Sequence, residues 1–147
     1  MKNMALLIDT NVLLNYVAGR EPGYRAATHI VQACKMSGIK GYIAFHTLPT
    51  IWYVMRKSQV INRRNVFLNI LDYLTVVSVP HETVIDALKD KNFADFEDCL
   101  QEKCALAVNA DYIVTENIKD FTASTVPAIT AAGMLRTLYN MDGELPC

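Results

Sequence analysis

Residues 4–11 read MALLIDTN, a stretch that passes from five apolar residues to three polar ones with no glycine or proline between them. A short, wholly apolar run is typical of a strand buried on both faces of a parallel sheet. Open α/β sheets place their binding sites at the carboxyl ends of such strands. Asp9, the first polar residue after the run, is therefore the first candidate for a functional side chain.

Similar apolar runs alternate with segments of helical spacing along the rest of the chain. We expect strands at 4–8, 41–45, 74–79 and 112–114, and a short edge strand at 126–129. We expect helices at 12–18, 24–37, 46–57, 62–72, 81–89 and 95–108, and a last helix that Thr130 caps and that reaches about Tyr139. Strands that alternate with helices through short loops form βαβ units, so we predict a three-layer α/β/α sandwich with a mainly parallel central sheet.

The 147 residues suit one domain, which we place at 1–141, with 142–147 as a frayed tail. A hydrophobic content of 52% supports a packed core and excludes a disordered chain. No apolar run approaches the roughly 18–20 residues of a membrane-spanning helix, and the apolar residues before Asp9 are too few for a secretory signal. The four cysteines form no C-x-x-C pair, which is typical of reduced thiols. We expect a cytoplasmic protein without a membrane segment.

The net charge of −1 hides a strong separation of charge along the chain. Between Pro22 and Leu71 there are seven bases and no acid, whereas Asp72 to Cys147 holds thirteen acids and five bases. Such an asymmetry indicates an anionic partner for one half and a metal or cationic partner for the other. The alternative is two solvated faces that differ by chance, and it loses force if the acids converge in the fold.

Acidic residues occupy the places where an α/β sheet builds its sites. Asp9 follows the first strand, and others begin the helix at 95–108 or follow the fourth strand: Asp95, Glu97, Asp98, Glu116 and Asp120. Converging carboxylates with open positions for water suit Mg²⁺ or Mn²⁺. Such an ion acidifies a bound water and neutralises charge on a phosphodiester, so the pattern points to a metal-dependent nuclease.

Several of these residues also have a purely structural explanation. Asp95 is a good N-cap, Asp98 suits the first turn of a helix, and Glu97 is expected to face solvent. Asp9 lacks such an explanation in the sequence. The three histidines, His29, His46 and His81, make no metal pattern with any cysteine.

Three segments resemble the motifs of the PIN domain, the fold of many bacterial toxin ribonucleases. They are DTNVLL at 9–14, DFEDCLQ at 95–101 followed by Ala105 and Ala107, and ADYIVTENIKDF at 110–121. The resemblance runs from Leu6 to about Leu138, with all three motifs in order. It implies a three-layer fold that cleaves RNA with one or two Mg²⁺ or Mn²⁺ ions held by three or four acids. Many members are the toxin of a toxin–antitoxin pair and form dimers.

Carried over motif by motif, the resemblance makes Asp9, Asp98 and Asp120 the catalytic, metal-binding acids. Asn117 or Glu116 is the alternative to Asp120, since the turn varies in length. Around the metal ligands, the resemblance assigns supporting positions to Asn11, Thr115, Asn117 and Thr50.

One motif departs from the family pattern. The family usually carries a Glu on the helix after the second strand, and Thr50 stands at that position here. Asp95, one turn before Asp98, is the candidate for the missing carboxylate and a further metal ligand. We expect a site with one acid fewer to bind metal weakly, with a need for millimolar Mg²⁺ or a preference for Mn²⁺.

The sequence leaves several functions to be compared. The first is a ribonuclease that attacks RNA with a metal-activated water; its phosphate contacts are Arg56, Lys57, Arg63 and Arg64. An antitoxin protein and a second copy of the chain are further expected partners. The alternative is a catalytically degenerate PIN domain that binds RNA or protein, which Thr50 favours. A phosphoacceptor signalling domain needs a pair of acids near the first strand, and residues 1–8 contain none.

Overall fold

The computed structural model describes residues 3–36, 38–57 and 62–142 of the 147-residue chain. Its centre is a five-stranded sheet in which every neighbouring pair is parallel, in the order β3-β2-β1-β4-β5. The strands are β1 (Met4–Ile8), β2 (Ile39–Ala44), β3 (Leu74–Val77), β4 (Tyr112–Val114) and β5 (Ala128–Ile129). The order places β1 between β2 and β4, so the residue that follows β1 lies at the middle of the sheet's carboxyl edge.

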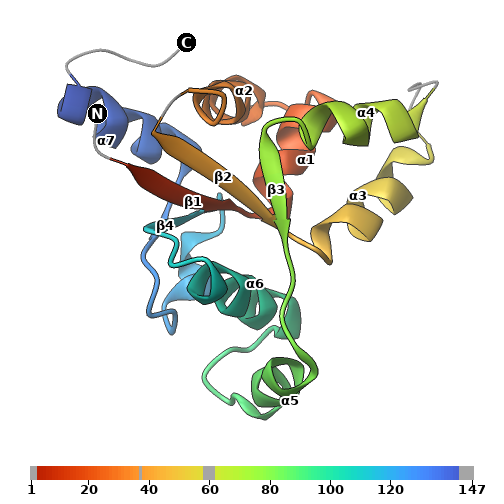
Figure 1. Cartoon of the computed structure of the whole chain (residues 1–147), viewed down its shortest axis with the longest axis vertical. Coiled ribbons are helices and arrows are strands. Elements are labelled where there is room, and N and C mark those ends of the chain that lie inside the picture. The colour runs from red at the N-terminus through yellow and green to blue at the C-terminus, as the bar shows by residue number, and fades with distance from the viewer. Residues whose placement is uncertain (1–2, 37, 58–61, 143–147) are drawn as a thin grey trace.

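Helices cover both faces of the sheet, as Figure 1 shows. They are α1 (Thr10–Ala18), α2 (Tyr24–Ala33), α3 (Thr47–Met55), α4 (Arg63–Ile70), α5 (His81–Lys89), α6 (Phe96–Ala107) and α7 (Ala131–Asp142), with a 3₁₀ turn, η1, at Ile118–Phe121. One face packs against α1, α2 and α7, and the other against α6, with α5 outside it. The predicted three-layer α/β/α sandwich with a parallel sheet is confirmed.

The core follows from the alternation of side chains along β1. Leu6 and Ile8 pack into the larger cluster with α1, α2 and α7, and Leu7 packs into the cluster beneath α6. All three side chains are fully buried, as a strand covered on both faces requires. This two-sided burial explains why residues 4–8 read as an unbroken apolar run.

Most expected elements are present, with ends that shift by a few residues. The helix expected at 24–37 ends at Ala33, because the chain turns through Cys34–Met36 to enter β2; Ser37 lies outside the described residues. Gly41 permits this close packing, since a Cβ there would approach the Cys34 Sγ to 2.5 Å. The 3₁₀ turn η1 has no counterpart among the sequence predictions.

The caps agree with the sequence more closely. Asn62 accepts a bond from the Asn65 N–H at the start of α4, and Thr130 accepts one from the Gly133 N–H before α7. Helix α1 ends at Ala18 and is capped by Gly19, which adopts φ 65°.

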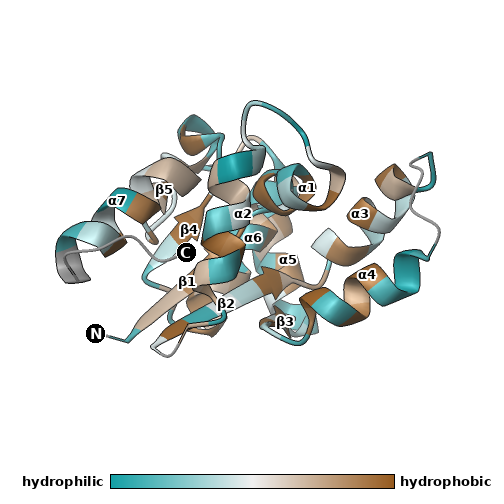
Figure 2. Cartoon of the chain, turned by 90° about the horizontal axis from the view of Figure 1, so that it is seen from above, coloured by the Kyte–Doolittle hydropathy of each residue, from teal (hydrophilic) through white to brown (hydrophobic). Residues whose placement is uncertain are grey.

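Helices α3 and α4 lie side by side at one end of the molecule. Figure 2 shows both hydrophobic and hydrophilic residues along each of them. The Trp52 and Phe67 rings stack 5.9 Å apart and join the two helices. The four basic residues that the sequence predicts to contact RNA are Arg56 and Lys57, directly after α3, and Arg63 and Arg64, which begin α4.

The remaining expectations concern the cysteines, the membrane and the C-terminal end. Cys34, Cys99 and Cys104 are free and buried, and Cys147 lies outside the described residues. No helix in the described part of the chain has the length and apolar character needed to span a membrane. Helix α7 continues to Asp142, and 143–147 of the expected tail lie outside the description.

Candidate active site

Asp9 sits at the junction of β1 and α1, and its carboxylate is both buried and heavily hydrogen-bonded. It is 5% exposed, and it accepts bonds from the Thr10 N–H (2.8 Å), the Asn11 side-chain amide (3.1 Å) and the Thr115 hydroxyl (2.7 Å). The bond from Thr10 makes Asp9 the N-cap of α1, a structural role that the sequence analysis did not recognise. Burial raises its pKa, while the bonds from Thr115 and Thr10 oppose that rise.

Asn11 and Thr115 tie the segment after β1 to the segment after β4. The Asn11 amide donates to the Thr115 hydroxyl oxygen (3.3 Å), and its carbonyl oxygen accepts the Glu116 N–H (3.2 Å). The Asn117 N–H donates to the Thr115 hydroxyl oxygen at 3.0 Å. Asn11 and Thr115 both donate to the Asp9 carboxylate and are themselves held by these bonds. The orientation of the Asp9 carboxylate is therefore fixed.

The start of α6 brings a second carboxylate to the same place. Asp95 caps the helix by accepting the Asp98 N–H at 3.0 Å. Asp98 is half-buried, and its pKa rises to about 7 because of burial and the negative charges of Asp95, Asp9, Asp120 and Glu97, in that order. A carboxyl that titrates near neutral pH is typical of functional sites.

Asp120 reaches the site from the turn η1. Its side chain is exposed, and the next residue, Phe121, is buried against Phe93 with ring centroids 6.5 Å apart. The Asp120 charge raises the pKa of both Asp9 and Asp98. Asp9, Asp98 and Asp120 lie far apart in the sequence. The fold thus brings them close enough for their charges to affect one another.

The alternatives to Asp120 are placed differently. The Glu116 carboxylate accepts a hydrogen bond from the Ala131 N–H (3.1 Å) and so stabilises the start of α7. Asn117 is exposed, and its backbone N–H is the group that joins the Thr115 hydroxyl.

Thr50 and its surroundings form a neutral polar network. The Thr50 hydroxyl donates to the His46 carbonyl oxygen (3.1 Å) within α3. Nearby, the Gln101 amide donates to the Thr10 and Thr47 hydroxyl oxygens, both at 3.2 Å, and these hydroxyls lie 2.8 Å apart. Hydroxyl and amide groups therefore join α1, α3 and α6 beside the acids.

The sequence analysis missed the roles of Gln101, Glu97 and His46. Gln101 lies three residues after Asp98, so helical spacing alone would have placed it on the same face. Glu97 is exposed as expected, but its charge raises the pKa of Asp9 and of Asp98. Burial lowers the pKa of His46, and Glu97 opposes that effect; no signal in the sequence linked these two residues.

The donors at this acidic site are chemically suited to a hard divalent cation, since carboxylate oxygens are the ligands that Mg²⁺ and Mn²⁺ prefer. Within 3–36, 38–57 and 62–142, no three histidine, cysteine or acidic side chains are arranged as a ready-made coordination group. The pKa of Asp98 is raised first by burial and then by repulsion from the neighbouring carboxylates, whose charges are not neutralised. The donor set fits a cation, and binding one requires the side chains to move closer together.

The basic residues lie just after α3 and at the start of α4. The guanidinium of Arg63 lies 4.0 Å from the centre of the Trp52 ring and donates to the Trp52 carbonyl oxygen at 2.8 Å. Arg64 lies 5.4 Å from the same ring, and Arg56 lies 3.7 Å from the Tyr53 ring. Lys57 is exposed at the end of α3. The cluster presents positive charge together with exposed aromatic surface.

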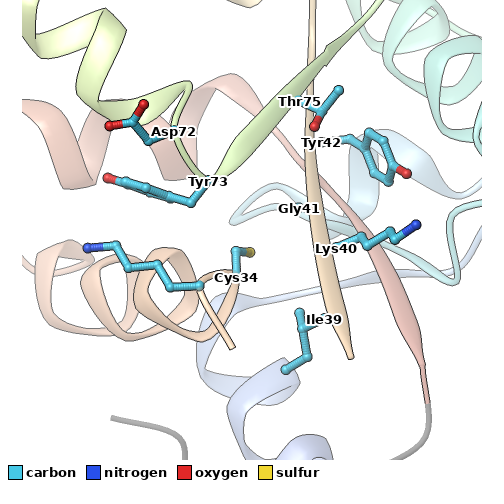
Figure 3. A pocket seen from close by; sticks show the side chains of 9 residues that line it. Cys34, Ile39, Lys40, Gly41, Tyr42, Asp72, Tyr73 and Thr75 are labelled. Carbon is cyan, nitrogen blue, oxygen red and sulfur yellow. The ribbon is translucent and has the colours of Figure 1, made fainter. Parts of the chain in front are cut away.

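A separate cavity of about 590 Å³ lies at the other end of the sheet (Figure 3). It lies between the end of α2 and the beginnings of β2 and β3, and its lining includes Cys34, Lys40 and Tyr73. Lys35 sits 4.5 Å from the centre of the Tyr73 ring beside it. Because the acids gather at the carboxyl ends of the strands, this cavity is not part of the acidic site.

Comparison with known proteins agrees with this architecture. The family model described as "PIN domain" matches residues 5–119. One similar solved structure is VapBC2 from Rickettsia felis bound to a DNA fragment from their promoter. It is 18% identical, with a TM-score of 0.62 over 86% of this chain and 98% of that chain. No curated protein sequence matches the chain.

Proposed function

The chain belongs to the PIN domain family, and from that premise we propose that it is an endoribonuclease that depends on Mg²⁺ or Mn²⁺. Asp9, Asp98 and Asp120 are its metal-binding acids in this proposal. The observation that carries it is the convergence of three carboxylates, which follow β1, begin α6 and lie in η1. Burial raises the pKa of Asp98 to about 7, and the charges of Asp95, Asp9 and Asp120 add to that rise.

The residues around these acids have defined tasks in the proposal. Asn11 and Thr115 orient Asp9 through the bonds described above. Asp95 holds the first turn of α6, and with it the backbone of Asp98. A bound divalent ion would supply an acidified water and would offset charge on the scissile phosphodiester. The chain contributes the three carboxylates, of which Asp9 is held in a fixed orientation by its hydrogen bonds.

The substrate face in this proposal is the basic end of α3 and α4. Arg56, Lys57, Arg63 and Arg64 would contact phosphates of RNA, and Tyr53, which is 62% exposed, would stack on an unpaired base. A nuclease needs such a surface because its acids alone repel a polyanion.

Partners are a further part of the proposal. The structural neighbour belongs to VapBC2, a toxin–antitoxin complex, and this supports an antitoxin protein as the partner of our chain. A homodimer is also proposed, because apolar side chains remain exposed on α3 and α4, among them Val54 and Leu68.

Cleavage of a mixed-sequence RNA tests the function. We expect purified protein to cut with Mg²⁺ or Mn²⁺ and not with EDTA, and Asp9→Asn and Asp98→Asn to lose at least about 100-fold in rate, because each removes a proposed metal ligand. The absence of cleavage with either metal in a folded protein would favour the catalytically degenerate binding module. Cleavage that survives both substitutions would place the active site elsewhere.

A further inference from the structure

Helix α6 contacts both of the strands that lead to the other two proposed metal ligands. Asp98 stands in the first turn of α6. The helix packs against β1, which leads to Asp9, and against β4, which leads to the turn η1 with Asp120. The separations between the three carboxylates therefore depend on how α6 is fixed against its neighbours.

Two consecutive polar residues of α6, Gln101 and Glu102, are buried one turn after Asp98. They are 2% and 3% exposed. Successive residues of a helix are separated by about 100° around its axis, so these two side chains point in different directions. Asp98, three and four positions earlier, lies between the two directions. Burying such groups is costly unless they are hydrogen-bonded, so their partners indicate what they do.

Gln101 connects α6 to the segment that carries Asp9. Its amide donates to the hydroxyl oxygens of Thr10 and Thr47, both at 3.2 Å. Thr10 is the residue whose N–H donates to the Asp9 carboxylate at 2.8 Å. The two hydroxyl oxygens also lie 2.8 Å apart and bond each other, so one amide ties α6 to both α1 and α3.

Glu102 makes the corresponding connection to the segment that carries Asp120. One of its carboxylate oxygens accepts the Thr125 N–H at 2.8 Å, and the other lies 3.2 Å from the Lys103 Nζ. Phe121, which follows Asp120, packs in the hydrophobic cluster beneath α6. The hydrogen bond to Thr125 thus holds the far end of a segment whose near end carries the acid.

An apolar side chain of similar size would fill the space at either position. It would pack there without fixing a direction, whereas a hydrogen bond requires a short distance and a narrow angle. Two adjacent positions of one helix carry polar groups, and each group bonds a different segment that bears an acid. This arrangement constrains the geometry of the acidic site as well as the core.

We propose that Gln101 and Glu102 are positioning residues, which set the separations between the acids of the metal site. Gln101 holds Asp98 relative to Asp9, and Glu102 holds it relative to Asp120. Both act on the backbone positions from which the carboxylates reach the ion, and neither touches the ion itself. The inference rests on the proposed function, since the ion that depends on these separations is the ion of that proposal.

Binding of Mn²⁺ in the absence of RNA tests this inference. We would measure the Mn²⁺ affinity of each variant by calorimetry and the stability of its metal-free form by urea unfolding. Glu102→Met and Glu102→Gln remove the same charge, but only glutamine keeps an oxygen that can accept the Thr125 N–H. Glu102→Met should therefore bind Mn²⁺ about 10-fold more weakly than Glu102→Gln, the lower end of the range for loss of a group that supports a metal ligand. Gln101→Met, which changes no charge, should weaken affinity by a similar factor relative to the wild type.

Cys104→Ala is the control for a general loosening of α6. Cys104 is fully buried in the same helix, and its thiol donates to the Val77 carbonyl oxygen (3.8 Å) in β3, which carries none of the proposed ligands. This variant should unfold at lower urea concentration and still bind Mn²⁺ like the wild type.

Three outcomes would overturn the inference and leave the proposed function standing. They are a Gln101→Met protein that binds like the wild type, a Glu102→Met protein that binds as well as Glu102→Gln, and a Cys104→Ala protein that loses as much affinity as the methionine variants. If Glu102→Met does not fold, the comparison of Gln101→Met with Cys104→Ala decides the inference. A wild-type protein that binds no Mn²⁺ would overturn both the inference and the proposed function.

Discussion

The acidic site and the basic surface between α3 and α4 carry opposite charges, and they are built in different ways. The acids come from three distant segments, 9, 95–98 and 120, and only the parallel sheet brings them together. The bases lie within 56–64 and are neighbours in any fold that keeps two consecutive helices. The acidic site thus depends on tertiary structure, whereas the basic surface depends on local sequence and on rings that hold its arginines.

This difference predicts two kinds of response to substitution. Carboxylates that share one ion act together, so losing one should affect catalysis steeply. Phosphate contacts act one by one, so losing each should weaken RNA binding by a similar, salt-dependent amount.

After the loss expected for Asp9→Asn and Asp98→Asn, the next largest effect is expected from substitution of Asp120, for which Glu116 is the alternative. Asp120→Asn should lower the cleavage rate about 10- to 100-fold, in the range seen when a metal site loses a supporting group. Glu116→Gln should leave the rate nearly unchanged, because an amide oxygen can still accept the Ala131 N–H. Cleavage rates of the two proteins at saturating Mg²⁺ measure this, and a larger loss in Glu116→Gln would reverse the assignment.

A smaller, graded effect is expected on the basic surface. We choose Lys57→Gln with Arg64→Gln and leave Arg63, which bonds the Trp52 carbonyl oxygen, in place. Loss of two phosphate contacts should reduce by about 1.4 the slope of log affinity against log salt for single-stranded RNA.

The control for the basic surface is Lys89→Gln with Lys91→Gln, which removes the same charge near the end of α5. Filter binding with metal-free protein at several salt concentrations measures both pairs. Equal changes in slope for the two pairs would show that RNA binding depends on the net charge of the protein and not on the α3–α4 surface.

The smallest effect concerns the stability of the metal-free protein. The pKa of Asp98 rises from an ordinary 3.8 to about 7 in the fold. The folded state therefore holds this proton more tightly than the unfolded state, and Asp98 lowers the stability progressively as pH rises from about 4 to about 7. Asp98→Asn should remove that part of the pH dependence. The stability of the variant relative to the wild type should therefore increase as the pH approaches neutral. Urea unfolding across this range measures it, and a difference that does not change with pH would contradict the shift.

The sequence predicted the architecture well because buried segments have a recognisable pattern of apolar residues. The unbroken apolar run of β1 and the capping residues Asn62 and Asp95 are local signals, and the structure confirms the elements they predict. The position of α2's last turn was predicted less well, since Ala33 and Ser37 are both compatible with helical spacing. That end is decided by the packing of Cys34 against Gly41, a contact that spacing does not record.

The acids proposed for the site could be named from the sequence, whereas the residues around them could not. Asp9, Asp98 and Asp120 stand in recognisable motifs, but the seam of His46, Thr47 and Gln101 joins residues more than fifty positions apart. The exposed Glu97 illustrates the same limit. Its position in the first turn of α6 is typical of a solvated acid, and only the fold reveals that its charge reaches Asp9.

The central claim is that the acids bind a cation and that the basic residues take no part in this binding. The most direct test is the increase in the free energy of unfolding when millimolar Mg²⁺ is added at about pH 8. We predict a clear gain for the wild type, the same gain for the protein with Lys57→Gln and Arg64→Gln, and none for Asp98→Asn. An Asp98→Asn protein that gains as much as the wild type would contradict the account.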